Sequence, residues 1–447
     1  MRYFLLFCLV LLCVSCVSDD DVGALADPIV FKGEMVWAKQ FGGSGDDTFQ
    51  EIIATNDGGY ALLGYSNSTD GDLQGKNTAV NDYWLLKIDA QGETEWVKTY
   101  GGSKDDRGQS LVQTQDGGYA LVGYAMSDDG DGSNNEGFHD NWILKLDASG
   151  AIAWQYSFGF SGHDHAYDLV ETADEGFLFV GFLDVTAANG QGNFGKKNTS
   201  GLVRHGVGEF WATKLDKFGN LQWRRYFGGT NNDRAHSVVQ ADDGGIVMAG
   251  FSESDDFDVS DTQGSYDFWV VKISATGQMV WERSFGGSGI EIAQDIAKTP
   301  DGAYVVTGHT FSTDSDISKN RGESDLWLIK VSDQGELLWE KTLGGSGFDA
   351  GASVFVNNQG EIILAGNSKS TDGDLTENHG ENDLWLLKTN EAGKILWQKS
   401  FGGNALDFGF DAIQDATGKL ILVGEVQTSF QGNTHHGGKD GVMILVE

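Results

Sequence analysis

Two short apolar runs separated by a tight turn recur along most of the chain. In residues 82–103 the first run is Tyr-Trp-Leu-Leu-Lys-Ile, the second is Glu-Trp-Val-Lys-Thr-Tyr, and Ala-Gln-Gly lies near the turn between them. Runs of this length around a glycine-containing turn predict two antiparallel strands joined as a hairpin. Gly101 and Gly102 then end the second strand.

The hairpin recurs with a period of about 58 residues, which indicates a repeat architecture. The tryptophan of the second hairpin strand occurs seven times, at Trp37, Trp96, Trp154, Trp223, Trp281, Trp339 and Trp397. The tryptophan of the first strand occurs twelve residues before its partner, at Trp84, Trp142, Trp211, Trp269, Trp327 and Trp385. These two sets account for all 13 tryptophans, so every one belongs to the repeat.

Two further positions keep the same register. An acidic residue follows each tryptophan of the first set by ten residues, at Asp47, Asp106, Asp164, Asp233, Glu291, Asp349 and Asp407. A glycine follows by 27 residues, at Gly64, Gly123, Gly181, Gly250, Gly308, Gly366 and Gly424. We expect the acids to be structural, as loop caps or as partners of the lysine that recurs in the first hairpin strand, at Lys87, Lys145, Lys214, Lys272, Lys330 and Lys388.

Each copy therefore predicts four strands, A to D: a run after the acid (51–54 in the first copy), a run ending at the glycine (60–64), and the two hairpin strands. Four-stranded units that are apolar on both faces are stable when stacked as propeller blades. The chain begins with a lone D strand (34–41) and ends with a lone C strand (441–447), which together complete a seventh blade. We predict an all-β, seven-bladed β-propeller over residues 31–447, in which the strand B glycine makes room for the strand C tryptophan.

The first thirty residues differ from the repeat. Residues 1–15 combine Arg2 with a short apolar run, which is typical of a secretory signal. All 3 cysteines lie at or before Cys16, so the repeats contain no thiol. The net charge of −36 argues against nucleic acid or an anionic membrane surface as a partner.

The repeat, from Asp-Gly-Gly-Tyr to Asp-x-Trp-Leu-Leu-Lys-x-Asp and Gly-x-x-x-Trp-x-Lys-x-Phe-Gly-Gly, resembles bacterial seven-bladed propeller repeats of secreted and surface proteins of the Bacteroidota. Val14-Ser15-Cys16 resembles the end of a lipobox, although Cys13 stands where leucine is usual, and the acidic residues 19–21 resemble a signal for surface export. The resemblance implies a lipid anchor on Cys16, a tether over residues 16–30 and an outer-membrane protein facing the cell exterior. It implies no shared catalytic motif.

Length variation is confined to the loop between strands B and C. The separation from the strand B glycine to the strand C tryptophan is 19 or 20 residues in five copies but 30 before Trp211. Because binding residues concentrate on loops held by a rigid scaffold, the face bearing the B-C and D-A loops is the candidate site. The long loop carries four cationic candidate ligand-binding residues, Lys196, Lys197, Arg204 and His205. A D-A loop adds His163 and His165, which flank Asp164 and could bind zinc or copper; loop histidines without a metal are the commoner alternative.

Five B-C loops carry an Asp-x-Asp pair, and carboxylate oxygens are calcium ligands. The candidate calcium ligands are Asp70, Asp72, Asp129, Asp131, Asp256, Asp258, Asp314, Asp316, Asp372 and Asp374. The alternative, which we favour, is that these carboxylates satisfy loop amides.

Three functions remain open. The first is a lipid-anchored, monomeric surface propeller that binds a glycan or a surface protein on its B-C face without catalysis. The second is a glycan lyase or hydrolase acting at the same face through His163, His165 or scattered aspartates. The third is an accessory subunit of an outer-membrane complex. The sequence contains no catalytic constellation specific enough to favour the enzyme.

Overall fold

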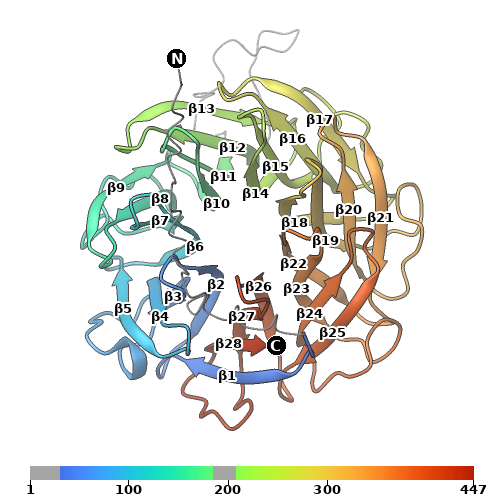
Figure 1. The fold of residues 1–447 in the computed structure, drawn as a ribbon. Helices are drawn as coiled ribbons and strands as arrows, with labels where there is room; N and C mark the ends of the chain where they lie inside the picture. Colours follow the sequence, from blue (N-terminus) through green and yellow to red (C-terminus); the bar gives the residue numbers. More distant parts are fainter. Residues whose placement is uncertain (1–30, 185–207) are drawn as a thin grey trace, which may run out of the picture.

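Seven four-stranded antiparallel sheets are arranged radially around a central channel (Figure 1). The computed structural model describes residues 31–184 and 208–447. In these residues the only helical element is the short 3₁₀ turn η1 (Gly71–Leu73). The predicted seven-bladed propeller is therefore confirmed, including the order of strands A to D within each blade. The predicted signal peptide, Cys16 and tether lie outside the described residues.

The strands follow the repeat in chain order. Blade 1 contains β2 (Asp47–Ala54), β3 (Tyr60–Ser66), β4 (Asp82–Ile88) and β5 (Thr94–Tyr100). Blade 2 contains β6 (Asp106–Gln113), β7 (Tyr119–Ala125), β8 (Asp140–Leu146) and β9 (Ile152–Phe158). Blade 3 contains β10 (His165–Glu171), β11 (Phe177–Asp184), β12 (Gly208–Leu215) and β13 (Leu221–Phe227).

The second half of the ring repeats this plan. Blade 4 contains β14 (Asp233–Gln240), β15 (Ile246–Ser252), β16 (Asp267–Ile273) and β17 (Met279–Phe285). Blade 5 contains β18 (Glu291–Lys298), β19 (Tyr304–Thr310), β20 (Asp325–Val331) and β21 (Leu337–Leu343). Blade 6 contains β22 (Asp349–Val356), β23 (Ile362–Ser368), β24 (Asp383–Thr389) and β25 (Ile395–Phe401).

Blade 7 joins the two ends of the described chain. It contains β26 (Phe408–Gln414), β27 (Leu420–Val426), β28 (Asp440–Val446) and, as its outer strand, β1 (Met35–Phe41) (Figure 1). The antiparallel pairing of β1 with β28 runs from Phe41 opposite Gly441 to Met35 opposite Val446. This pairing closes the ring as predicted, so blade 7 has the same four strands as its neighbours.

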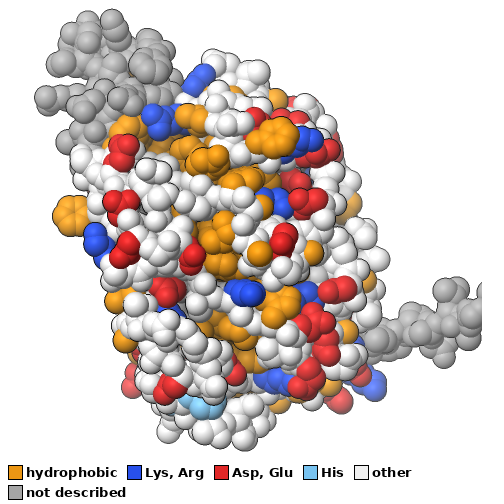
Figure 2. All heavy atoms as spheres, turned by 90° about the vertical axis from the view of Figure 1, so that its left-hand side faces the viewer, with side chains coloured by type: hydrophobic (Ala, Val, Ile, Leu, Met, Phe, Trp, Pro, Cys, Tyr) orange, Lys and Arg blue, Asp and Glu red, His pale blue; other side chains and the backbone are white. Residues whose placement is uncertain are grey.

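The apolar cores lie between adjacent blades. One core combines Leu62 and Trp84 of blade 1 with Val423 and Met443 of blade 7, all buried. Each sheet is apolar on both faces because each face packs against a neighbouring blade. Figure 2 shows the outer side of the ring over the blades at the left of Figure 1, where apolar side chains form small patches among charged ones. No helix of the described residues is long and apolar enough to cross a membrane.

Two features of the fold require glycine at the conserved-spacing position of strand B, and the sequence predicted one of them. In blade 1, Gly64 lies in register between Phe49 and Trp84, whose rings stack across it at 4.3 Å. The second reason is a β-bulge in strand A, where the register shifts between Phe49 and Glu51. The bulge turns the Thr48 carbonyl toward Gly64, and a methyl group added at Gly64 would collide with that oxygen.

The same collision recurs in all seven blades, from the carbonyl of the corresponding strand A residue. In blade 1, strand A also begins earlier than predicted, at Asp47 rather than after it. A strictly alternating pattern cannot locate this start, because the bulge interrupts the alternation.

We expect Trp327→Ala to lower the free energy of unfolding by roughly 3 to 5 kcal/mol, because the Trp327 indole is fully buried between blades. Trp339→Ala, in the outer strand β21, is the matched control and should cost clearly less, since Trp339 is only half-buried. Urea denaturation followed by tryptophan fluorescence measures both. Equal losses would contradict the assignment of strand C as the buried centre of the blade.

Candidate functional site

The acid at the start of strand A holds the loops of the B-C face. Asp47 is fully buried, and its Oδ2 accepts hydrogen bonds from Gly43 N–H at 2.7 Å and Ser68 Oγ at 2.8 Å. The Ser66 hydroxyl donates to Oδ1. One carboxylate thus joins the D-A loop to the end of strand B, and the cap interpretation is confirmed for it.

The strand C lysines have different partners, toward the A-B turns. Lys87 Nζ lies 2.9 Å from Asp57 Oδ2, and Lys330 Nζ lies 2.7 Å from Asp301 Oδ2. Asp57 and Asp301 belong to the turns after strand A. The lysines therefore stabilise the face opposite the capping acids.

The Asp-x-Asp pairs hold the neighbouring D-A loop. Asp70 Oδ1 accepts a hydrogen bond from Ser44 N–H at 2.7 Å, and Asp72 Oδ2 accepts one from Gly42 N–H at 2.8 Å. Equivalent bonds are made by Asp129 and Asp131, Asp256 and Asp258, Asp314 and Asp316, and Asp372 and Asp374. These contacts are the amide-satisfying role that the sequence favoured, and calcium binding stays a prediction.

Three histidines from two blades meet on the B-C face. His139 immediately precedes β8, His163 lies in the loop before β10, and His165 begins β10. His139 Nδ1 lies 3.0 Å from His163 Nδ1 and 3.3 Å from His165 Nε2. The sequence predicted the pair His163 and His165 as candidate ligand-binding residues and missed His139. Lys196, Lys197, Arg204 and His205 lie outside the described residues.

Backbone pairing brings these histidines together. A parallel bridge joins His139 to His163, and Asp164 N–H donates to His139 O at 2.7 Å. The Asp164 carboxylate is buried and accepts hydrogen bonds from Phe160 N–H and Asp184 N–H, so it serves as the capping acid of blade 3. Burial raises the pKa of Asp164 to about 7.

Aromatic rings fix the imidazoles. Tyr124 stacks on His165 with ring centroids 3.9 Å apart, and the exposed Phe138 stacks on His163 at 5.0 Å. Burial, together with smaller contributions from the neighbouring histidines and arginines, lowers the pKa of His165 to about 3. His165 is therefore neutral at physiological pH and keeps a lone pair on its ring.

A row of aromatic rings and arginines continues around the same face. Its members follow either the capping acid or the strand B glycine by one residue. The aromatic–arginine row consists of Tyr65, Arg107, Tyr124, His165, Phe182, Arg234 and Phe251. The Arg107 guanidinium lies 5.0 Å from the Tyr65 ring, and the Arg234 guanidinium lies 4.4 Å from the Phe182 ring, so both pairs make cation–π contacts.

The two arginines differ in their partners. Arg107 Nε donates to Asp105 Oδ2 at 2.9 Å, which neutralises its charge locally. Arg234 makes no salt bridge within residues 31–184 and 208–447, and its buried Nε has no hydrogen-bond partner there. No carboxylate among these described residues pairs with the Arg234 charge, so the guanidinium is suited to an anionic ligand.

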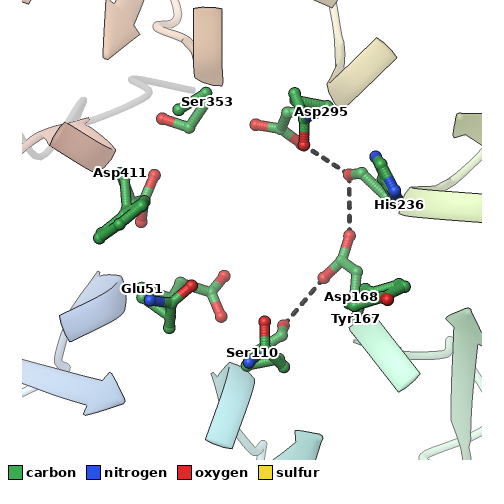
Figure 3. Close-up of a pocket in the computed structure, with 14 residues that line it drawn as sticks. Glu51, Ser110, Tyr167, Asp168, His236, Asp295, Ser353 and Asp411 are labelled. Atoms are coloured by element: carbon green, nitrogen blue, oxygen red, sulfur yellow. Dashed lines mark hydrogen bonds between the residues drawn. The ribbon is translucent and has the colours of Figure 1, made fainter. Parts of the chain in front are cut away.

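The central channel is lined by a ring of acids and serines from strand A (Figure 3). In blade order the ring consists of Glu51, Ser110, Asp168, Ser237, Asp295, Ser353 and Asp411. It borders a cavity of about 120 Å³. The acids and serines alternate around the ring except where Asp411 meets Glu51.

These side chains connect the blades. Ser237 Oγ lies 2.8 Å from Asp168 Oδ2 and 2.6 Å from Asp295 Oδ1, and Ser110 Oγ donates to Asp168 Oδ1 at 2.9 Å (Figure 3). Asp295 Oδ2 also accepts a hydrogen bond from Val354 N–H of the next blade at 2.7 Å. The bond to Val354 satisfies a backbone donor that strand A presents to the channel.

Burial in the protein raises the pKa of all four acids. Burial is the larger cause in each, and repulsion from ring carboxylates adds to it in Glu51, Asp295 and Asp411. The pKa of Asp295 is raised to about 7. Asp295 therefore keeps its proton to a higher pH than a free carboxyl group would.

Sequence reasoning missed this ring, although one signal was present. The residue four positions after the capping acid is acidic or serine in all seven copies. A strand of period two places Gln50 but not Glu51 toward the channel. The bulge brings both side chains to the channel wall, and only the tertiary structure shows the bulge.

No protein-family model and no curated protein matches the chain. A similar solved structure is a protein of unknown function from Bacteroides caccae, with 12% identity, 76% of this chain and 93% of that chain covered, and a TM-score of 0.39. YCF48 bound to D1 peptide shares 10% identity over 94% of this chain and 99% of that chain, with a TM-score of 0.47. BamB from Moraxella catarrhalis shares 12% identity over 93% of this chain and 100% of that chain, with a TM-score of 0.41. At these values no function is carried over to this chain.

We expect Asp295→Asn to flatten the dependence of stability on pH. The Asp295 carboxyl ionises at about pH 7 in the folded protein but near pH 4 in the unfolded chain, so the folded state binds its proton more tightly. Its contribution to stability is therefore greatest below about pH 4 and is lost as the pH rises to about 7. Asparagine cannot ionise and keeps an oxygen for Val354 N–H.

The measurement is the melting temperature of variant and unaltered protein between pH 5 and pH 8. The variant should gain relative to the unaltered protein as the pH rises. Asp255→Asn, at an exposed position of the B-C face, is the control and should leave the profile unchanged. Parallel profiles for Asp295→Asn would show that the ring does not hold the proton.

Proposed function

We propose that this protein is a lipid-anchored binding module of the outer cell surface, which holds an acidic glycan or protein segment on its B-C face without catalysis. The ligand groups that fit are carboxylates or sulfates. The observation that carries the proposal is Arg234, a cation without a salt-bridge partner in the described residues of a chain whose net charge is −36.

The Arg234 side chain is preorganised to bind a carboxylate or sulfate. Its guanidinium lies against the face of Phe182, which fixes the side chain without neutralising it. Preorganised donors bind more tightly because less side-chain entropy is lost on binding. Phe182 is itself buried, so a ligand group meets the guanidinium rather than the ring.

The long B-C loop of blade 3 connects directly to this position. Strand β12 begins at Gly208, and a methyl group added there would lie 3.8 Å from Arg234 Nε. Residues 185–207, with the predicted ligand-binding residues Lys196, Lys197, Arg204 and His205, separate β11 from β12. We propose that this loop adds selectivity to a contact made by Arg234.

The test is binding of acidic and neutral polysaccharides, and of acidic peptides, to the purified protein. Arg234→Thr should weaken binding of the acidic ligand at least tenfold, because it removes the charge that pairs with carboxylate or sulfate. Threonine is chosen because Thr48 occupies the equivalent register in blade 1. Arg283→Gln, in the outer strand β17, is the matched control and should bind as before.

Equal melting temperatures of Arg234→Thr and the unaltered protein would show that the variant folds. If Arg234→Thr binds every ligand as well as the unaltered protein, Arg234 has no part in binding. If neither the acidic polysaccharides nor the acidic peptides bind at all, the proposed ligand class is wrong.

The proposed anchor has its own test. Cys16→Ser removes the thiol that would carry the lipid, so the protein should move from the membrane fraction to the soluble fraction of the cell envelope. Protease treatment of intact cells that express the unaltered protein should degrade it, since it faces the exterior. A variant that remains in the membrane fraction would contradict lipidation at Cys16.

A further inference from the structure

Hydrogen bonds cannot account for all the short nitrogen–nitrogen contacts in the cluster of His139, His163 and His165. His139 Nδ1 belongs to both short nitrogen–nitrogen contacts, at 3.0 and 3.3 Å. A ring nitrogen has either one proton or one lone pair to offer, so it can complete one of these contacts but not both. Hydrogen bonding at His139 Nδ1 can therefore satisfy only one of the two imidazole nitrogens that lie against it.

The spacing matches that around a tetrahedral metal ion. Zn²⁺ binds imidazole nitrogens at about 2.0–2.1 Å, which places two such nitrogens roughly 3.3 Å apart. Two contacts of the cluster have this length, and one ligand atom from each histidine lies within 4.8 Å of the others. Of the described histidines, cysteines and acids, this is the one group of three placed to hold a metal ion.

The surroundings orient His139 as a ligand. Its second ring nitrogen, Nε2, is buried and faces Asp105 Oδ2 at 3.8 Å. A carboxylate on that side favours the proton on Nε2 and leaves the Nδ1 lone pair toward the cluster. Asp105 is itself held by Asn81 Nδ2 and Arg107 Nε.

The three histidines occupy positions that the repeat leaves free. His139 takes the position before strand C. His163 and His165 take the positions before and after the capping acid. At the other six blade junctions none of these positions holds histidine. The fold requires no histidine here, since the same backbone bridge forms between Asn382 and Leu406 and between Ser324 and Phe348.

We propose that His139, His163 and His165 bind a divalent transition-metal ion of the zinc class at the junction of blades 2 and 3. Three imidazole ligands suit Zn²⁺ or Cu²⁺ and disfavour Ca²⁺ and Mg²⁺, which prefer oxygen ligands. His163 is exposed, so water or a ligand group can reach the cluster and could complete the coordination of a bound ion. The site does not depend on the proposed binding function.

The test uses purified protein that has been stripped of metal with a chelator and dialysed. Calorimetric titration should show one Zn²⁺ or Cu²⁺ per chain, with Cu²⁺ the tighter, and no binding of Mg²⁺ at this site. Zn²⁺ should raise the melting temperature, because a bound ion that bridges two blades stabilises the folded state. Co²⁺ should give the visible absorption of a tetrahedral nitrogen site.

Variants taken from other blades limit damage to the fold. His139→Asn, His163→Asn and His165→Thr copy Asn81, Asn232 and Thr48 at the equivalent positions. Each should weaken Zn²⁺ binding at least tenfold and abolish the thermal shift. The control is His435→Asn with His436→Gln, which removes the other histidine pair of this face and should bind Zn²⁺ as before.

Two results would overturn the proposal. One is the absence of stoichiometric Zn²⁺ or Cu²⁺ binding to the unaltered protein. The other is unchanged binding by His139→Asn, His163→Asn and His165→Thr combined, while the control pair loses it. Circular dichroism and the melting temperature without metal show whether each variant is folded, so lost binding is not mistaken for unfolding.

Discussion

The B-C face depends on a buried carboxylate at the start of each inner strand. In blade 1, Asp47 accepts hydrogen bonds from the D-A loop and from two serines at the end of strand B and just after it. Asp70 and Asp72 accept hydrogen bonds from the same D-A loop. Burying a charge without partners is expensive, and these donors offset that cost. The result is a rigid face on which the loop backbones are determined by the repeat.

Because the loop backbones are rigid, side chains that differ between blades are held in defined positions and indicate where binding can occur. In blade 3 the capping acid is Asp164, and the residues on either side of it are His163 and His165. Because Asp164 is bound by the backbone of Phe160 and Asp184, its two neighbours are held in fixed directions. A histidine cluster built on such a frame loses little entropy on binding an ion, and the same holds for Arg234 beside its capping acid Asp233.

In the channel ring, hydrogen bonds between blades are offset in part by repulsion between the carboxylates. Its four acids bind backbone donors of neighbouring blades, but the carboxylates face one another across a narrow space, and their pKa values are raised. The hydrogen bonds join the blades at the axis, where the sheets come closest together. The electrostatic cost is limited because serines stand between most of the acids and donate to them.

The sequence by itself determined the number of blades, the strand order and the closing strand, because each depends on spacing within one chain: the 13 tryptophans, seven capping acids and seven glycines all keep one register. It also identified His163 and His165 as candidates, because they flank a capping acid in place of the residues usual there. Only the tertiary structure decided which residues meet across blades. His139 lies 24 residues before His163, in a different kind of loop, and the two become neighbours through a bridge between blades. Glu51 joins the channel through a bulge that breaks the alternation of strand A. Periodicity describes one strand at a time, whereas both sites depend on how neighbouring backbones pair and bend.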